Sequence, residues 1–162
     1  MSKARYLPSK MPPAAGFLGF RLMRSGNGSA VYEFRPNENH QNTSGSLHGG
    51  VLCALADETM GRAFKTLLPS GSSGVTVEFK INFLSPVFPG DCLRASSEVI
   101  SRGKSFFYIE CAIRHHSGKL AAKSSGTFRV VSGGLRGEKG KEKSKSGMVR
   151  RSAKGDFHEK AE

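Results

Sequence analysis

Residues 44–64 read SGSLHGGVLCALADETMGRAF, and this stretch decides the fold. The pattern predicts a helix from about residue 48 to residue 67, after which Pro69 ends it. The helix is apolar on nearly every side, so we expect one sheet to wrap it. One carboxylate, Asp57, stands within the apolar run, although carboxylates are rarely buried without a partner or a task.

The segments on either side of this helix alternate in the manner of β-strands. The pair Asn27-Gly28, a strong hairpin signal, separates the apolar segments 17–23 and 29–36. Residues 75–83 alternate apolar with polar side chains, which predicts a strand with one apolar face. Three further strands follow between residues 92 and 131. One long helix beside about six mostly antiparallel strands predicts an α+β fold.

Length and charge divide the chain into a core and two ends. At 162 residues the chain is expected to form one domain, which we place at residues 16–132. Residues 1–15 are predicted to be loose. Residues 133–162 hold few apolar side chains and 9 of the 25 basic ones, and this composition predicts a basic, disordered tail. The net charge of +12 favours anionic partners, so a nucleic-acid role for the tail is a secondary expectation.

Composition also bears on compartment and cofactors. No stretch approaches the roughly 20 apolar residues of a membrane span, and the prolines near the N-terminus do not fit a signal peptide. Cys53, Cys92 and Cys111 are widely spaced and form no CxxC pair, which is typical of reduced core thiols rather than of a zinc site. We therefore expect a cytoplasmic protein with no metal site.

The glycine pair at the start of the helix is a candidate binding site. Amides in the first turn of a helix have no partner within the helix, and Gly49 and Gly50 would let a ligand approach them closely. The helix dipole adds partial positive charge, so the position suits an anion or a developing oxyanion. An ordinary helix start after a polar loop remains the alternative.

Asp57 lies on another part of the same helix. It comes nine residues after His48, which is about 13 Å along the axis and close to the opposite side. If both ends act on one substrate, the acid must therefore come from a second subunit, as a two-fold dimer allows. The alternative is a carboxylate that is hydrogen-bonded to a neighbouring loop.

The pattern N-x5-HGG-x6-D, formed by Asn42, the run 48–50 and Asp57, is more specific than HGG alone. Together with the strand that carries Thr76, it resembles the hotdog-fold acyl-CoA thioesterases of the phenylacetate-pathway (PaaI-like) type. The likeness covers about residues 16–131. It implies a long helix wrapped by an antiparallel sheet, a homodimer or a dimer of dimers, and hydrolysis of an acyl-CoA without a cofactor.

The resemblance also implies roles for single residues. Gly49 would donate its amide to the thioester carbonyl, and His48 would support the loop that carries this amide, and the carbonyl itself. Asn42 would orient the water or the thioester. Asp57 of the partner chain would be the general base or nucleophile, and Thr76 of that chain would help to place the water.

Three further positions are expected to bind substrate: Gly50 beside the carbonyl, and Arg102 and Lys104, on a turn, at the phosphates of CoA.

Two other functions stay open. One is a hotdog domain that senses acyl-CoA without turnover, and the other is a hotdog hydratase or dehydratase. The acyl group, and whether the carrier is CoA or an acyl-carrier protein, are left open by the sequence.

Overall fold

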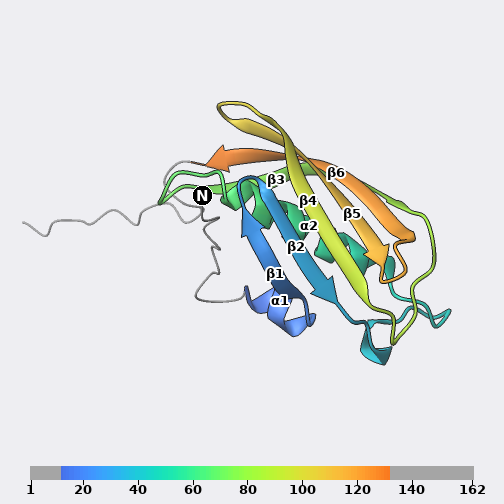
Figure 1. Cartoon of the computed structure of the whole chain (residues 1–162). Helices are drawn as coiled ribbons and strands as arrows, with labels where there is room; N and C mark the ends of the chain where they lie inside the picture. The colour runs from blue at the N-terminus through green and yellow to red at the C-terminus, as the bar shows by residue number, and fades with distance from the viewer. Residues whose placement is uncertain (1–11, 132–162) are drawn as a thin grey trace, which may run out of the picture.

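The computed structural model describes residues 12–131, which form one curved sheet around a central helix (Figure 1). The expected tail at 133–162 and residues 1–11 of the expected loose segment lie outside these residues, so those expectations stay predictions. Residues 13–15 were expected to be loose but belong to a short helix that buries Ala15. In chain order the elements are α1 (Pro13–Phe17), β1 (Arg21–Gly26), β2 (Ser29–Phe34), η1 (Glu38–His40), α2 (Gly49–Lys65), β3 (Ser73–Phe83), β4 (Leu93–Arg102), β5 (Phe106–His115) and β6 (Leu120–Val131).

All six strands pair in one antiparallel sheet with the order β1-β2-β4-β5-β6-β3. The sheet bends around α2, whose core-facing side chains are fully buried against it. The predicted α+β hotdog arrangement is confirmed. Because the order begins with β1 and ends with β3, these two strands are the edges of the sheet.

The predicted hairpin forms at Asn27-Gly28, where both residues have positive φ (50° and 76°), as a tight primed turn requires. The start of its first strand was predicted too early, because α1 occupies Pro13–Phe17. Prolines favour the first helical positions, and Gly19 (φ 73°) ends the helix in a left-handed cap. Such a five-residue helix is too short to leave a periodic signal.

Strand β3 departs from simple alternation at a bulge. Thr76 pairs with Phe128, but the next paired residue is Glu78, opposite Thr127, so Val77 has no partner in the ladder. The extra residue reverses the side-chain alternation. Thr76 therefore faces the helix together with Phe79, whereas Val77 is 55% exposed. The expectation of a single apolar face along residues 75–83 was wrong for this reason.

The cysteines differ in burial, although the sequence favoured core thiols for all three. Cys111 is buried in the core as expected, but Cys53 and Cys92 are only partly buried; all three thiols are free. Among the described helices, none has the length and apolar character to cross a membrane.

Candidate active site

The N-terminus of α2 presents one unoccupied amide. His48 caps the helix, because its Nδ1 accepts a hydrogen bond from the Gly50 amide (2.9 Å) and its carbonyl accepts one from the Val51 amide (2.9 Å). Within residues 12–131, no group accepts a hydrogen bond from the Gly49 amide. His48 therefore acts as the N-terminal cap of α2. It occupies the Gly50 amide and leaves the Gly49 amide available to a ligand.

Asn42 is held beside this amide by its own loop. Its Oδ1 accepts from the Ser44 amide (2.9 Å), and its Nδ2 donates to the Ser46 hydroxyl (3.0 Å). Asn42 and Gly49 line one cavity of about 400 Å³, together with Ser46, Leu47, Leu52, Phe83, Leu84, Ser85, Pro86 and Val87. We call this cavity the amide cleft.

Asp57 and Thr76 meet at a second place. The Thr76 hydroxyl donates to Asp57 Oδ1 at 2.7 Å, which joins the helix to the edge strand β3. Both residues line a cavity of about 160 Å³, with Glu58, Gly61, Arg62, Phe64, Lys65, Gly74 and Phe128. We call this cavity the acid cleft. The bulge in β3 brings Thr76 to this position.

The two clefts share no lining residue. Within one chain the structure brings Asn42 near Gly49 and Thr76 to Asp57, but it does not unite the two pairs. Eight residues along α2 separate Gly49 from Asp57, about 12 Å along the axis.

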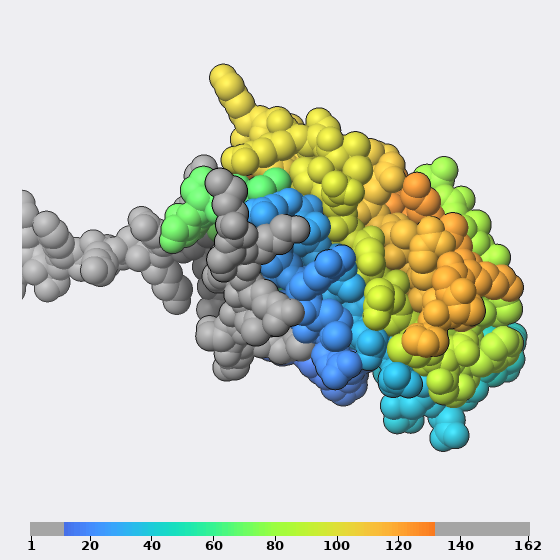
Figure 2. Space-filling model, viewed as in Figure 1, coloured from blue at the N-terminus to red at the C-terminus, as the bar shows by residue number. Residues whose placement is uncertain are grey.

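The other three predicted binding residues lie elsewhere. Gly50 donates its amide to His48 and lines neither cleft. Arg102 and Lys104 line a separate cavity of about 650 Å³ beyond the C-terminal end of α2. The guanidinium of Arg102 lies 5.7 Å from the centre of the Phe107 ring. The β4–β5 turn, yellow in Figure 2, projects from the surface.

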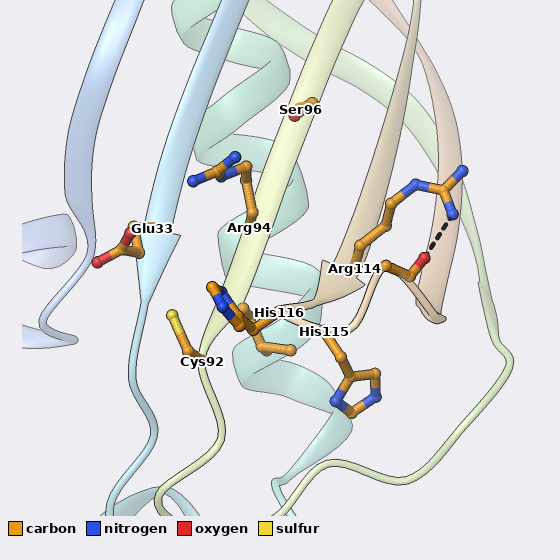
Figure 3. Close-up of a pocket in the computed structure, with 9 residues that line it drawn as sticks. Glu33, Cys92, Arg94, Ser96, Arg114, His115 and His116 are labelled. Atoms are coloured by element: carbon orange, nitrogen blue, oxygen red, sulfur yellow. Dashed lines mark hydrogen bonds between the residues drawn. The ribbon is translucent and has the colours of Figure 1, made fainter.

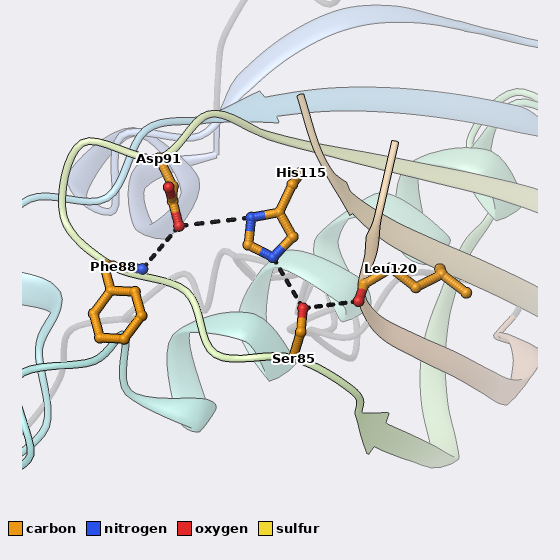
Figure 4. Close-up of polar contacts among 5 residues, drawn as sticks. All are labelled: Ser85, Phe88, Asp91, His115 and Leu120. Carbon is orange, nitrogen blue, oxygen red and sulfur yellow. Dashed lines mark hydrogen bonds and ion pairs between the residues drawn. The ribbon is translucent and has the colours of Figure 1, made fainter. Parts of the chain in front are cut away.

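Sequence reasoning missed a polar chain behind the amide cleft (Figure 4). His115 lies with Nδ1 3.6 Å from Asp91 Oδ2 and Nε2 3.0 Å from the Ser85 hydroxyl. Ser85 donates its own proton to the Leu120 carbonyl (2.9 Å), so its hydroxyl is a tether and not an activated nucleophile in this arrangement. The chain fixes the wall of the amide cleft to β5 and β6. Ser85 comes 30 residues before His115 and 35 before Leu120, so no local pattern reveals these contacts.

Two other features are outside both clefts. A cavity of about 210 Å³ on the outer face of the sheet is lined by Glu33, Arg94, Arg114 and His116 among others, and by no predicted site residue (Figure 3). Cys53, on α2, has its thiol pKa raised by burial, which opposes the formation of a nucleophilic thiolate.

Comparison with known proteins identifies the family. The Thioesterase superfamily matches residues 44–122, which include the start of α2, Asp57 and Thr76. The chain is 31% identical over 115 residues to the protein SSO2140 of Saccharolobus solfataricus, whose name classes it as an esterase; the match covers 71% of this chain and 81% of that protein. The chain belongs to the thioesterase superfamily.

Other members of the thioesterase superfamily are similar in sequence and in fold. The acyl-coenzyme A thioesterase PaaI of Escherichia coli is 30% identical over 121 residues, covering 75% of this chain and 84% of PaaI. The solved PaaI structure superposes with a TM-score of 0.71 at 28% identity, over 75% of this chain and 86% of that one. A Streptococcus pneumoniae thioesterase solved with coenzyme A has a TM-score of 0.67 at 25% identity, over 72% and 91% of the two chains.

Proposed function

We propose that the protein hydrolyses acyl-CoA thioesters in an active site that two chains share. The observation that carries this proposal is the placement of a free amide at Gly49 and a hydrogen-bonded carboxylate at Asp57 on separate clefts of one helix. These are the two groups that thioester hydrolysis needs, an oxyanion donor and a base. The coenzyme A held by a similar structure supports CoA as the carrier.

The chemistry follows from these groups. The thioester carbonyl oxygen accepts a hydrogen bond from Gly49, where the helix dipole further stabilises the negative charge of the tetrahedral intermediate. Asp57 of the partner removes a proton from the attacking water, whose oxygen bonds to the carbonyl carbon. The carbon–sulfur bond then breaks, and the departing thiolate of CoA takes up a proton. The alternative role for Asp57 is direct attack on the carbonyl, which forms an anhydride that water then hydrolyses.

Thr76 and Asn42 position these groups. Because Thr76 donates to one carboxylate oxygen of Asp57, the other oxygen can point to the water. Asn42, whose amide is fixed by Ser44 and Ser46, lies where it can orient the water or the thioester.

The edge strand β3 supports the pairing of two chains. It runs for 11 residues, pairs with β6 on one side only, and carries the exposed side chains Val77 and Phe83. A long edge strand with apolar side chains readily pairs with another strand. A two-fold axis beside β3 would join two sheets and bring each acid cleft toward the partner's amide cleft.

The test is release of free CoA from a panel of acyl-CoAs by the wild type and by the variants Asp57→Asn and Asp57→Ala. We expect both variants to fold and to lose at least about 1000-fold in kcat, because they lose the base. The unfolding midpoint of each variant serves as the folding control. Turnover close to that of the wild type in both folded variants would contradict the role of Asp57.

A further inference from the structure

Arg62, on α2, is a buried cation without a charged partner. The residue is 7% exposed, and its Nε is sealed from solvent with no hydrogen-bond partner. Among the described residues, no carboxylate lies within 4.0 Å of its nitrogens. A buried charged donor left unpaired costs considerable free energy, so such a group in a native protein calls for an explanation.

Glu58, one helical turn before Arg62 on α2, is already engaged. The Tyr32 hydroxyl donates to Glu58 Oε1 at 2.7 Å. Burial and then this hydrogen bond raise the pKa of Tyr32 to about 12, against the opposing effect of Arg62 beside the hydroxyl, so Tyr32 keeps its proton. The carboxylate of Glu58 is thus held by Tyr32 and does not pair with Arg62.

Arg62 lines the acid cleft together with Asp57 and Thr76. It follows Asp57 by five residues, which is about 7.5 Å along the helix axis and about 140° around it. Gly61 lies between them, and a β-carbon there would contact only Phe128, at 3.9 Å. The surface of the helix between the acid and the arginine is therefore open to an elongated group.

We propose that Arg62 binds a carboxylate at the far end of the acyl group, so that the preferred substrates are monothioesters of short dicarboxylic acids. This assignment rests on the proposed thioesterase function, because the length of the acyl chain is counted from Asp57 as the base. Because the Arg62 Nε is sealed from solvent, the carboxylate would pair with the two terminal nitrogens, whose parallel N–H groups form a fork that matches both carboxylate oxygens. An extended chain advances about 3.5 Å per three bonds, so 7.5 Å corresponds to about six bonds. Glutaryl and adipyl groups have this reach.

The decisive experiment compares three thioesters that differ at the far end of the acyl group: glutaryl-CoA, its neutral methyl ester, and pentanoyl-CoA. For the wild type we expect kcat/KM for glutaryl-CoA to exceed that for both neutral thioesters by about 10- to 100-fold, the value of a hydrogen bond to a charged group. Arg62→Met keeps the apolar stem and should abolish this ratio, while Arg62→Lys should retain part of it. Arg94→Met, which removes an exposed arginine on the outer sheet face, should leave the ratio unchanged.

Binding supplies a readout that does not depend on turnover. Calorimetric titration of the Asp57→Asn variant with the same three thioesters should show the same preference for glutaryl-CoA. The double variant that carries both Asp57→Asn and Arg62→Met should lose this preference. If the wild type hydrolyses no thioester, the proposed function fails, yet this titration still decides whether Arg62 holds the carboxylate.

Three outcomes would overturn the assignment. The first is equal kcat/KM of the wild type for glutaryl-CoA and its methyl ester, a comparison that needs no variant to fold. The second is an unchanged ratio in folded Arg62→Met. The third is an equal loss of affinity of Arg62→Met for all three thioesters and for CoA itself, which would assign the anion to a phosphate of CoA.

Discussion

At the residue scale, the contact between Thr76 and Asp57 fixes the orientation of the candidate base. The threonine hydroxyl donates to one carboxylate oxygen at 2.7 Å, so the other oxygen keeps its lone pairs for water. A carboxylate that could rotate freely would spend much of its time in unproductive orientations.

We therefore expect Thr76→Val, which has nearly the same shape without the donor, to lower kcat by about 10- to 100-fold. Thr76→Ser keeps the hydroxyl and should retain most of the activity. Steady-state kinetics on one acyl-CoA, with unfolding midpoints to confirm that both variants fold, provide the measurement. Full activity of Thr76→Val would show that Asp57 needs no such support.

The sequence predicted part of the candidate site. Asn42, Gly49, Asp57 and Thr76 belong to a spaced pattern, and the structure puts them in two clefts. Two lining residues escaped prediction, because the tether of Ser85 and the burial of Arg62 arise only where distant segments pack together. Arg102 and Lys104 line a third cavity, and their contact with the phosphates of CoA stays a prediction.

At the element scale, the main feature that the sequence did not predict is the bulge in strand β3. Helix α2, the hairpin at Asn27-Gly28 and the strands follow from periodicity and turn residues, which are local signals. The bulge at Val77 is set by pairing with β6, so the alternation of residues 75–83 could not reveal it. Helix α1 was missed because five residues are too few to show a period.

Close packing at the start of β3 leads to a stability prediction. A β-carbon at Gly74 would lie 2.6 Å from the Arg129 carbonyl oxygen and would also clash with the Phe64 ring. We expect Gly74→Ala to lower the free energy of unfolding by about 1–3 kcal/mol, as overpacking does. The control is its neighbour, Ser73→Ala, which removes a buried hydroxyl that has no partner in the described structure and should cost little. Urea unfolding of the three proteins measures the difference, and equal midpoints would contradict the clash.

At the scale of the whole molecule, the separation of the two clefts bears on how chains cooperate. Under the proposed mechanism, each site takes Gly49 from one chain and Asp57 from the other. Two chains that are inactive for different reasons should therefore restore activity when they are mixed.

We predict that Gly49→Pro and Asp57→Ala, each inactive alone, together recover about a quarter of the wild-type activity, since half of the dimers are mixed and each keeps one of its two sites. Proline is accepted at the first position of a helix, so this substitution removes the amide hydrogen and leaves the helix intact. Gly49→Ala keeps the amide hydrogen but places a β-carbon 3.2 Å from the Phe83 ring in the amide cleft, so it should lose less activity than Gly49→Pro. Affinity tags on the two chains confirm that mixed dimers form; tagged mixed dimers without activity would exclude a shared site.

The distance between the free amide and the carboxylate on α2 also has a consequence for how the enzyme is assayed. Under the proposed mechanism a lone chain holds two halves of different sites and no complete one. Specific activity should then fall on dilution once the protein concentration drops below the dissociation constant of the dimer. A thioesterase whose site lies within one chain would keep the same turnover per mole at every dilution.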